Sequence, residues 1–157
     1  MKNYRKLGFD SQETAEIAKA LNALMANYHV HYQKLRNYHW NVEGHEFFEL
    51  HEFFELEYNA VKLQIDEIAE RIRVFGKKPV STLKEYLEMA EIQETSNTLE
   101  AKEMSKEILN DFETLISLCI DAHEKTSLAG DLATSDLLIG YIKRTEKSHW
   151  MLSSFIK

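Results

Sequence analysis

The feature that most constrains the fold is a stripe of large apolar residues between positions 47 and 75, repeating at alternating steps of four and three. Such steps return to one face of an α-helix of about 3.6 residues per turn, whereas a strand has a period of two. The stripe comprises Phe54, Tyr58, Val61, Ile65, Ile68, Ile72 and Phe75. It predicts one long helix over residues 47–75.

Three further stretches show a similar period. The first is predicted to begin at Ser11, with an N-cap hydroxyl, and to end at His39. Its core positions are Ile17, Leu21, Leu24, Tyr28, His31, Leu35 and Tyr38. The second begins near Asn97 or Thr98, and its core positions are Met104, Ile108, Phe112, Leu115 and Ala122. The third follows Gly130, and its core positions are Leu138, Tyr141, Thr145, His149 and Leu152. We interpret His31 as a hydrogen-bonded core histidine.

The connections decide how these four helices are arranged. Two are short, whereas residues 77–98 form a long crossover. Within it Thr82 and Glu85 have capping-box spacing, which predicts a short helix to about Met89. A single long crossover is the ferritin-like arrangement. The predicted fold class is therefore all-α: a ferritin-like four-helix bundle with a long crossover that contains a short helix.

Domain organisation and compartment follow from composition. Residues 11–157 fit a single domain, and residues 1–10 are predicted to form a short mobile tail. The formal net charge of −7 disfavours binding of nucleic acid through the general surface and is compatible with attracting cations. No apolar run is long enough to span a membrane and no signal-peptide pattern is present, so we expect a cytoplasmic protein. The lone Cys119 is interpreted as a core residue.

Candidate metal ligands lie on a different face from the apolar stripe. Taking about 100° per residue and His51 as zero, Glu55 falls near 40°, Asp66 near 60° and Glu70 near 100°. His39 precedes this helix. The His51 and Asp66 pairs are 15 residues apart, which is roughly 22 Å of helix, so no single ion reaches both.

An antiparallel copy of the same helix, related by a two-fold axis, would bring one chain's upper pair beside its neighbour's lower pair. The pattern therefore suggests a metal site assembled between subunits. The alternative is a solvated polar face, since Asn59, Lys62 and Arg73 share this side.

A rival site is an internal di-iron centre, built in ferritin-like bundles from two Glu residues and two Glu-x-x-His motifs. Glu146 and His149 have the motif's spacing, but the helix over residues 47–75 has no matching motif. An intrasubunit di-iron carboxylate oxidase is thus the weaker hypothesis, and a structural His149 is favoured.

Several short motifs are spread over nearly the whole chain. They are Asn37-Tyr38-His39-Trp40-Asn41-Val42 with Gly44, Phe48, Leu50-His51, Asp66, Ile68-Ala69-Glu70-Arg71-Ile72 with Gly76 and Pro79, Thr82-Leu83-Lys84-Glu85-Tyr86, and His149-Trp150-Met151-Leu152. In these motifs and their separations the chain resembles the Dps family of mini-ferritins.

The resemblance implies a hollow homo-dodecamer that binds Fe(II) at two-fold interfaces, oxidises it preferentially with hydrogen peroxide, and stores ferric mineral inside, protecting against oxidative stress. It implies that His39 and His51 come from one chain and Asp66 and Glu70 from its neighbour. Glu55 stands where the family often has Asp, which leaves open direct ligation and a second iron position.

The expected iron is Fe(II)/Fe(III) at a mono-iron or di-iron ferroxidase site, without haem. Carboxylate and imidazole ligands suit iron, and zinc or manganese are alternatives. Trp40 resembles a family tryptophan close to the iron, or else serves as an interface anchor. DNA binding through the tail, with only Lys2, Arg5 and Lys6, is predicted to be weak or absent. A non-catalytic, DNA-organising bundle is the remaining alternative.

Overall fold

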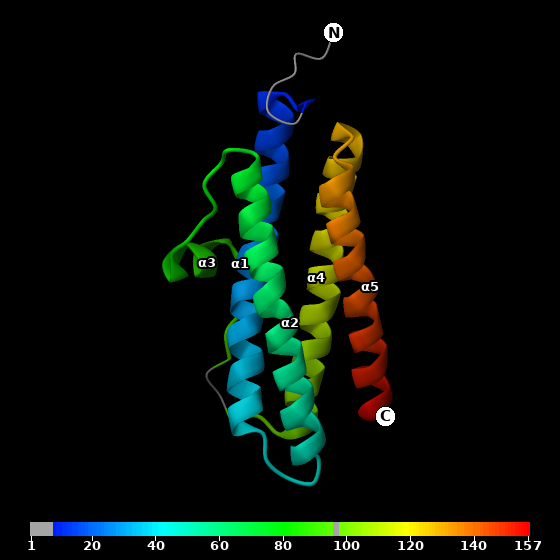
Figure 1. Cartoon of the computed structure of the whole chain (residues 1–157). Helices are drawn as coiled ribbons and strands as arrows, with labels where there is room; N and C mark the ends of the chain where they lie inside the picture. Colours follow the sequence, from blue (N-terminus) through cyan, green and yellow to red (C-terminus); the bar gives the residue numbers. More distant parts are fainter. Residues whose placement is uncertain (1–7, 96–97) are drawn as a thin grey trace.

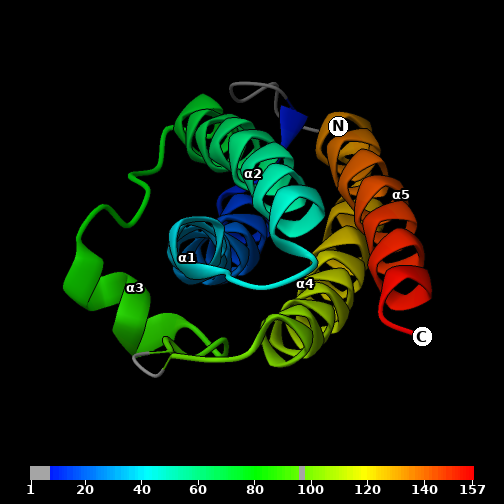
Figure 2. The same cartoon turned by 90° about the horizontal axis from the view of Figure 1, so that it is seen from below.

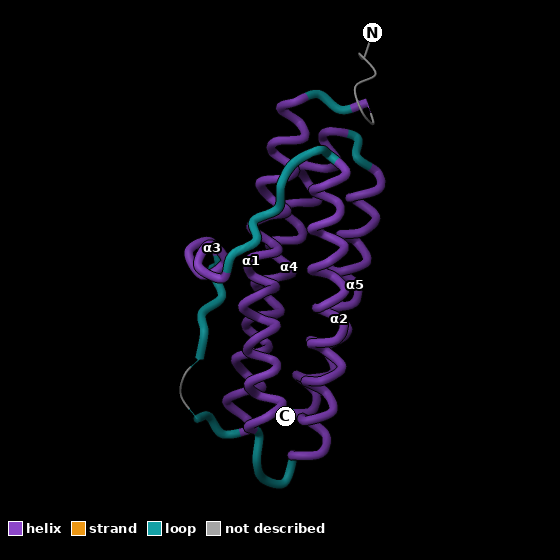
Figure 3. The backbone as a smooth tube through the Cα atoms, turned by 60° about the vertical axis from the view of Figure 1, so that its left-hand side comes forward, coloured by secondary structure: helices purple, strands orange, loops and turns teal. Residues whose placement is uncertain are grey.

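The computed structural model describes residues 8–95 and 98–157, and this part of the chain forms five helices and no strand. The helices are α1 (Ser11–Asn41), α2 (Phe47–Val74), α3 (Leu83–Met89), α4 (Ala101–Ala129) and α5 (Leu132–Phe155). Both α2 and α4 run in the same direction, so the chain returns between them along the outside of the bundle, where α3 lies (Figures 1 and 3). Viewed along its axis, the bundle has α3 outside it, beside α1 (Figure 2). The predicted all-α, ferritin-like bundle is confirmed.

The core is formed by the predicted apolar stripes. Its largest fully buried side chains are Tyr28, Tyr38, Phe54, Phe112, Ile17, Leu21, Leu24, Met25, Leu35, Leu50, Ile68 and Ile72. Burying a large apolar side chain contributes about 1.5–3 kcal/mol, so these contacts, rather than helix propensity, hold the bundle together. Among the described residues, no helix is long and apolar enough to cross a membrane.

Helix α1 begins at Ser11, as predicted, but its N-cap and its end differ from the prediction. Asp10, not Ser11, is the N-cap, because its carboxylate accepts hydrogen bonds from the backbone N–H groups of Gln12 and Glu13 at 2.8 Å each. The helix continues past His39 to Asn41. Just before it, Phe9 packs edge-on against Phe75, with ring centroids 5.7 Å apart. The tail residues Lys2, Arg5 and Lys6 lie outside the described residues.

Helix α4 begins at Ala101, later than the predicted Asn97 or Thr98, and Asn97 itself lies outside the described residues. The reason is local: the Glu103 carboxylate accepts the N–H of Glu100, which fixes the start of the helix. The short helix α3 begins where the capping-box spacing predicts, with Thr82 as N-cap.

Asparagines on α1 hold the crossover against the bundle. The side-chain oxygen of Asn27 accepts the backbone N–H groups of Glu91 and Ile92, both at 2.9 Å. In the same way, Asn22 accepts the N–H of Val80 at 2.9 Å. Because these backbone groups gain partners from α1, the crossover follows α1 and leaves the outer side of α2 uncovered.

Candidate metal centre

His39, in the last turn of α1, and His51, in the second turn of α2, form a stacked pair. Their ring centroids are 3.8 Å apart and the ring planes differ by 17°. The Nδ1 atom of His39 lies 2.7 Å from the backbone oxygen of His51, and the Nδ1 atom of His51 lies 2.7 Å from the backbone oxygen of His39. Gly44, with φ of +106°, permits the tight turn that brings the two helix ends together.

This reciprocal contact fixes which ring nitrogen is available. A carbonyl oxygen can only accept a hydrogen bond, so each Nδ1 must donate and carry the proton. In the neutral imidazoles of His39 and His51, both Nε2 atoms therefore keep a lone pair, and no described residue hydrogen-bonds to either of them. Metal-binding histidines have this arrangement, with the second nitrogen donating to a carbonyl or carboxylate. The pair is suited to bind a transition-metal ion.

Two aromatic side chains enclose the pair. Phe47 stacks on the His51 ring with centroids 4.9 Å apart, and Tyr58 meets the His39 ring edge-on at 5.3 Å. Burial raises the pKa of Tyr58, and the negative charge of the nearby Glu55 acts in the same direction, so the phenol remains protonated. Tyr58 is predicted from the sequence to lie in the core, and Phe47 is not among the predicted site residues. Its position four residues before His51 was the available signal, because residues four apart are neighbours on a helix surface.

The carboxylates lie elsewhere on α2. Asp66 and Glu70 are one helical turn apart and exposed, and no described residue forms an ion pair or side-chain hydrogen bond with either. Glu55, also exposed, follows His51 by one turn. Within residues 8–95 and 98–157, no three His, Cys, Asp or Glu side chains come together as a metal site. One chain thus presents a pair of histidines and, several turns further along α2, a pair of carboxylates. Neither pair alone supplies the three or more ligands of a usual metal site.

Over most of its length, the chain is similar to ferritin-like proteins. The model of the ferritin-like domain matches residues 18–157. DNA protection during starvation protein 2 of Bacillus anthracis is 42% identical over 141 residues, covering 90% of this chain and 97% of that protein. The Dps crystal structure from Vibrio cholerae, described as a member of a broad superfamily of ferritin-like diiron-carboxylate proteins, is 38% identical. It has a TM-score of 0.94 and covers 100% of this chain and 98% of that one.

The chain belongs to the Dps family of ferritin-like proteins. The relationship is broad: General stress protein 20U of Bacillus subtilis is 36% identical over 90% of this chain and 97% of its own length. The Dps structure from Staphylococcus aureus has 37% identity and a TM-score of 0.89, covering 95% of this chain and 98% of that one.

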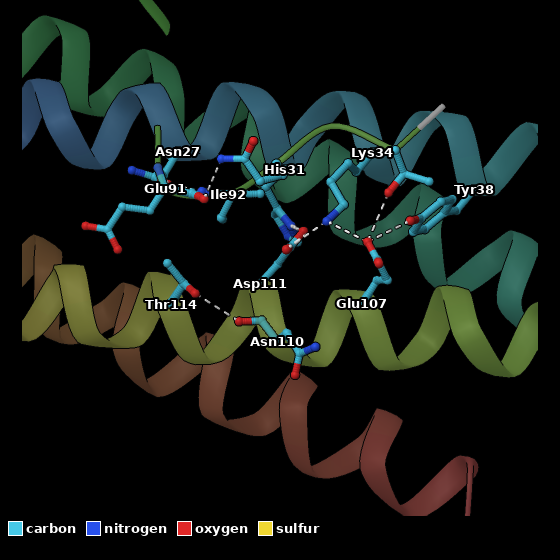
Figure 4. Close-up of polar contacts among 12 residues, drawn as sticks. Asn27, His31, Lys34, Tyr38, Glu91, Ile92, Glu107, Asn110, Asp111 and Thr114 are labelled. Atoms are coloured by element: carbon cyan, nitrogen blue, oxygen red, sulfur yellow. Dashed lines mark hydrogen bonds and ion pairs between the residues drawn. The ribbon is translucent and has the colours of Figure 1, made fainter. Parts of the chain in front are cut away.

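The interior of this Dps-family chain is occupied by internal ion pairs. On α1 and α4, the Asp111 carboxylate contacts His31 Nδ1 at 3.0 Å and Lys34 Nζ at 2.9 Å, and Lys34 also contacts Glu107 at 3.1 Å (Figure 4). Tyr38 donates to the same Glu107 carboxylate. His31 is fully buried, so its assignment as a hydrogen-bonded core histidine is confirmed.

The rival internal centre is not assembled. The prediction that His149 faces the core was wrong: its ring is about one-third exposed and pairs with Glu113 on the surface at 3.0 Å. Glu146 is exposed as well. The inward position is held by Ser148, which donates to the buried Glu57 at 2.8 Å. Arg144 donates to both oxygens of Glu57 and neutralises its charge, so Glu57 is not a free ligand for an iron ion inside the bundle.

Proposed function

We propose that this chain oxidises Fe(II), with hydrogen peroxide as the preferred oxidant, at sites formed between two copies, and stores the ferric product. The observation that carries the proposal is the reciprocal His39–His51 pair. Each Nδ1 is held by a backbone oxygen of the other histidine, so the Nε2 atom of each ring is left available to bind a metal ion. The other two ligands of such a site would be Asp66 and Glu70 of a second copy.

An antiparallel second copy is supported by the surface next to the ligands. Leu56 and Leu63 are 60% and 65% exposed and follow the same outer side of α2 as Asp66. Two large apolar side chains exposed two turns apart on one side of a helix are consistent with a surface that another copy covers. A two-fold axis across this side would bury both leucines and would place each histidine pair beside the partner's carboxylates, giving two equal sites.

The donor set suits iron as a substrate. Imidazole nitrogens bind Fe(II), and the carboxylates of Asp66 and Glu70 offset the additional charge of Fe(III). The overall reaction is balanced by two electrons: 2 Fe(II) + H₂O₂ + 2 H⁺ gives 2 Fe(III) + 2 H₂O. We assign Glu55 to the same site as a further carboxylate, one helical turn from His51, where it can bind a second iron or accept a proton.

Storage requires a closed particle, and we propose the hollow homo-dodecamer of the family, acting in the cytoplasm. Consuming Fe(II) and peroxide together would protect DNA without contacting it. Direct DNA binding is proposed to be weak or absent, because the chain carries a formal net charge of −7 that phosphate would repel. A tight, tail-dependent complex in a low-salt gel shift would contradict this part of the proposal.

The first experiment is an anaerobic titration of the assembled protein with Fe(II), its particle size checked by light scattering, followed by peroxide. We expect saturable binding of one or two Fe(II) per chain and rapid formation of Fe(III) on adding peroxide. A monomeric protein, or one that binds no Fe(II) before peroxide, would refute the proposal.

A complementation experiment tests the shared site directly. One chain carries His39→Ala and His51→Ala, the other carries Asp66→Ala and Glu70→Ala, and the two are co-expressed with different tags. In a mixed pair one site loses all four ligands and the other keeps all four. Each variant alone should therefore be inactive, whereas particles that carry both tags, assembled at random from equal amounts of the two chains, should regain roughly a quarter of the sites, because about half of their pairs are mixed. Absence of any regain in folded mixed particles would show that the ligands do not come from two chains.

A further inference from the structure

We propose that Phe47 is a positioning residue that holds the imidazoles of His51 and His39 ready to bind metal. This inference rests on the proposed function, since it concerns the same histidine pair. Phe47 carries no ligand atom, so any effect it has on metal binding must act through the rings it contacts.

The first supporting observation is a continuous stack of three rings. Phe47 stacks on the His51 ring, with centroids 4.9 Å apart and planes 23° apart. His39 also stacks on the His51 ring, with centroids 3.8 Å apart. Tyr58 contacts His39 edge-on at 5.3 Å. Each imidazole of the pair therefore has an aromatic neighbour of its own.

The second observation is that the first turn of α2 has no side-chain cap. The N-cap residue, Glu46, accepts no hydrogen bond from the helix with its side chain. The backbone N–H of Phe47 reaches only the Gly44 oxygen, at 3.3 Å. An N-cap side chain usually stabilises the start of a helix. This stabilisation is missing here, so the ring stack and the two histidine–carbonyl bonds make a larger relative contribution to the order of this region.

Removing the flat ring would open one face of His51 to water. Water would then compete for the carbonyl oxygens that fix each Nδ1, and the imidazoles would gain rotamers in which Nε2 points away from the ion. Metal binding would have to reverse this freedom. Loss of an outer contact to a metal-binding histidine typically lowers affinity about ten- to a hundredfold, and we expect the lower end because Phe47 donates no hydrogen bond.

The test uses the full assembled chain and cobalt(II) alone, as an ion that peroxide-free buffer does not oxidise. Phe47→Leu keeps an apolar side chain but loses the flat face, and Phe47→Tyr restores the face. Phe53→Leu is the matched control, because Phe53 is also partly buried on α2 but packs against Phe54 instead of a histidine.

Two readouts are measured beside thermal unfolding. The affinity for cobalt(II), measured by calorimetry, should fall about tenfold in Phe47→Leu and recover in Phe47→Tyr. In Phe53→Leu the affinity should equal that of the unaltered chain, even where its Tm falls as much as that of Phe47→Leu. Deuterium exchange at the imidazole C2 position, followed by mass spectrometry without metal, should quicken at His51 in Phe47→Leu alone.

Native cobalt(II) affinity together with native C2 exchange in Phe47→Leu would overturn the positioning role. An equal loss of affinity in Phe53→Leu would overturn it too, since it would reveal a general effect of destabilisation. Failure of the proposed function looks different: His51→Ala would then bind cobalt(II) as well as the unaltered chain, while C2 exchange at His39 and His51 would still report on Phe47.

Discussion

Arg144 on α5 donates two hydrogen bonds to the carboxylate of Glu57 on α2, at 2.9 and 3.0 Å. Glu57 is buried, and Ser148 gives it a third hydrogen bond. This pair joins the two helices through the part of the bundle where an internal metal centre would need free carboxylates. Because Arg144 and Ser148 already occupy its oxygens, Glu57 is not free to act as a ligand of an internal metal centre.

The first prediction concerns this pair. Arg144→Met should destabilise the protein by about 2–3 kcal/mol, because Glu57 would be left buried without its counter-charge; Arg144 is partly exposed, which lowers the usual cost. Chemical denaturation measures the effect. The double variant Glu57→Gln with Arg144→Met should recover part of the loss, and Lys143→Met, an exposed residue on the same helix, should change stability little. A negligible effect of Arg144→Met would contradict the assignment.

The second prediction separates the two possible sites. His51→Ala should abolish most Fe(II) oxidation by peroxide, whereas Glu146→Gln and His149→Ala should leave the rate within about twofold, since the latter pair faces solvent and does not converge with other ligands. Stopped-flow absorbance of the ferric product measures both. The opposite pattern, with activity lost only in the α5 variants, would support the intrasubunit oxidase.

The third prediction is a pH dependence of stability. Burial alone would raise the pKa of Glu107, but hydrogen bonding and charge from Lys34 outweigh it and lower the pKa, with help from Thr95 and Tyr38. A carboxyl group whose pKa is lower in the folded chain stabilises the fold at pH values above its unfolded pKa of 4.5. This stabilisation is lost as the pH falls through the lowered pKa of the folded chain.

The Tm difference between the unaltered chain and Glu107→Gln should thus be larger at neutral pH than near pH 3. Glu107 is partly exposed, so the difference should be modest. Glu124→Gln, an exposed change on the same helix, serves as the control and should show no such trend. Equal differences at both pH values would refute the interpretation.

The fourth prediction concerns the cysteine. Burial raises the pKa of the Cys119 thiol to about 12, although contact with the Tyr28 hydroxyl acts in the opposite direction. At neutral pH the thiolate is therefore scarce as well as inaccessible, so iodoacetamide should modify the native protein very slowly and the denatured protein readily. Cys119→Ala should retain full iron oxidation. Rapid alkylation of the native chain would show that the core opens at this position.

The fifth prediction addresses the crossover. Asn27→Leu would leave the backbone N–H groups of Glu91 and Ile92 without their acceptor, each at a cost of about 1–3 kcal/mol if they stay buried. The crossover should instead detach locally, so amide exchange over residues 83–92 should quicken while α4 stays protected. Asn110→Leu, on an exposed part of α4, is the control. Unchanged exchange over the crossover would mean that other contacts hold it.

The helices could be predicted from the sequence because each depends on its own residues. The steps of four and three between Phe54 and Ile72 define a helical face without reference to any partner, and Thr82 and Glu85 define a helix start through a contact that spans three residues. His51, Asp66 and Glu70 could likewise be chosen as candidate ligands from their spacing, because a face is a property of one helix. His39 lies on another helix, and it was chosen through the family resemblance.

Orientation of side chains required the tertiary structure. Ser148 and His149 fit the α5 stripe about equally, and the charge of Glu57 on a neighbouring helix selects Ser148 for the inward position. The rings of His39 and His51 are fixed by carbonyl groups 12 residues away in the chain. Sequence period determines which residues can share a surface; which atoms point where is set by hydrogen bonds between helices, because a buried polar group settles only where another element supplies its partner.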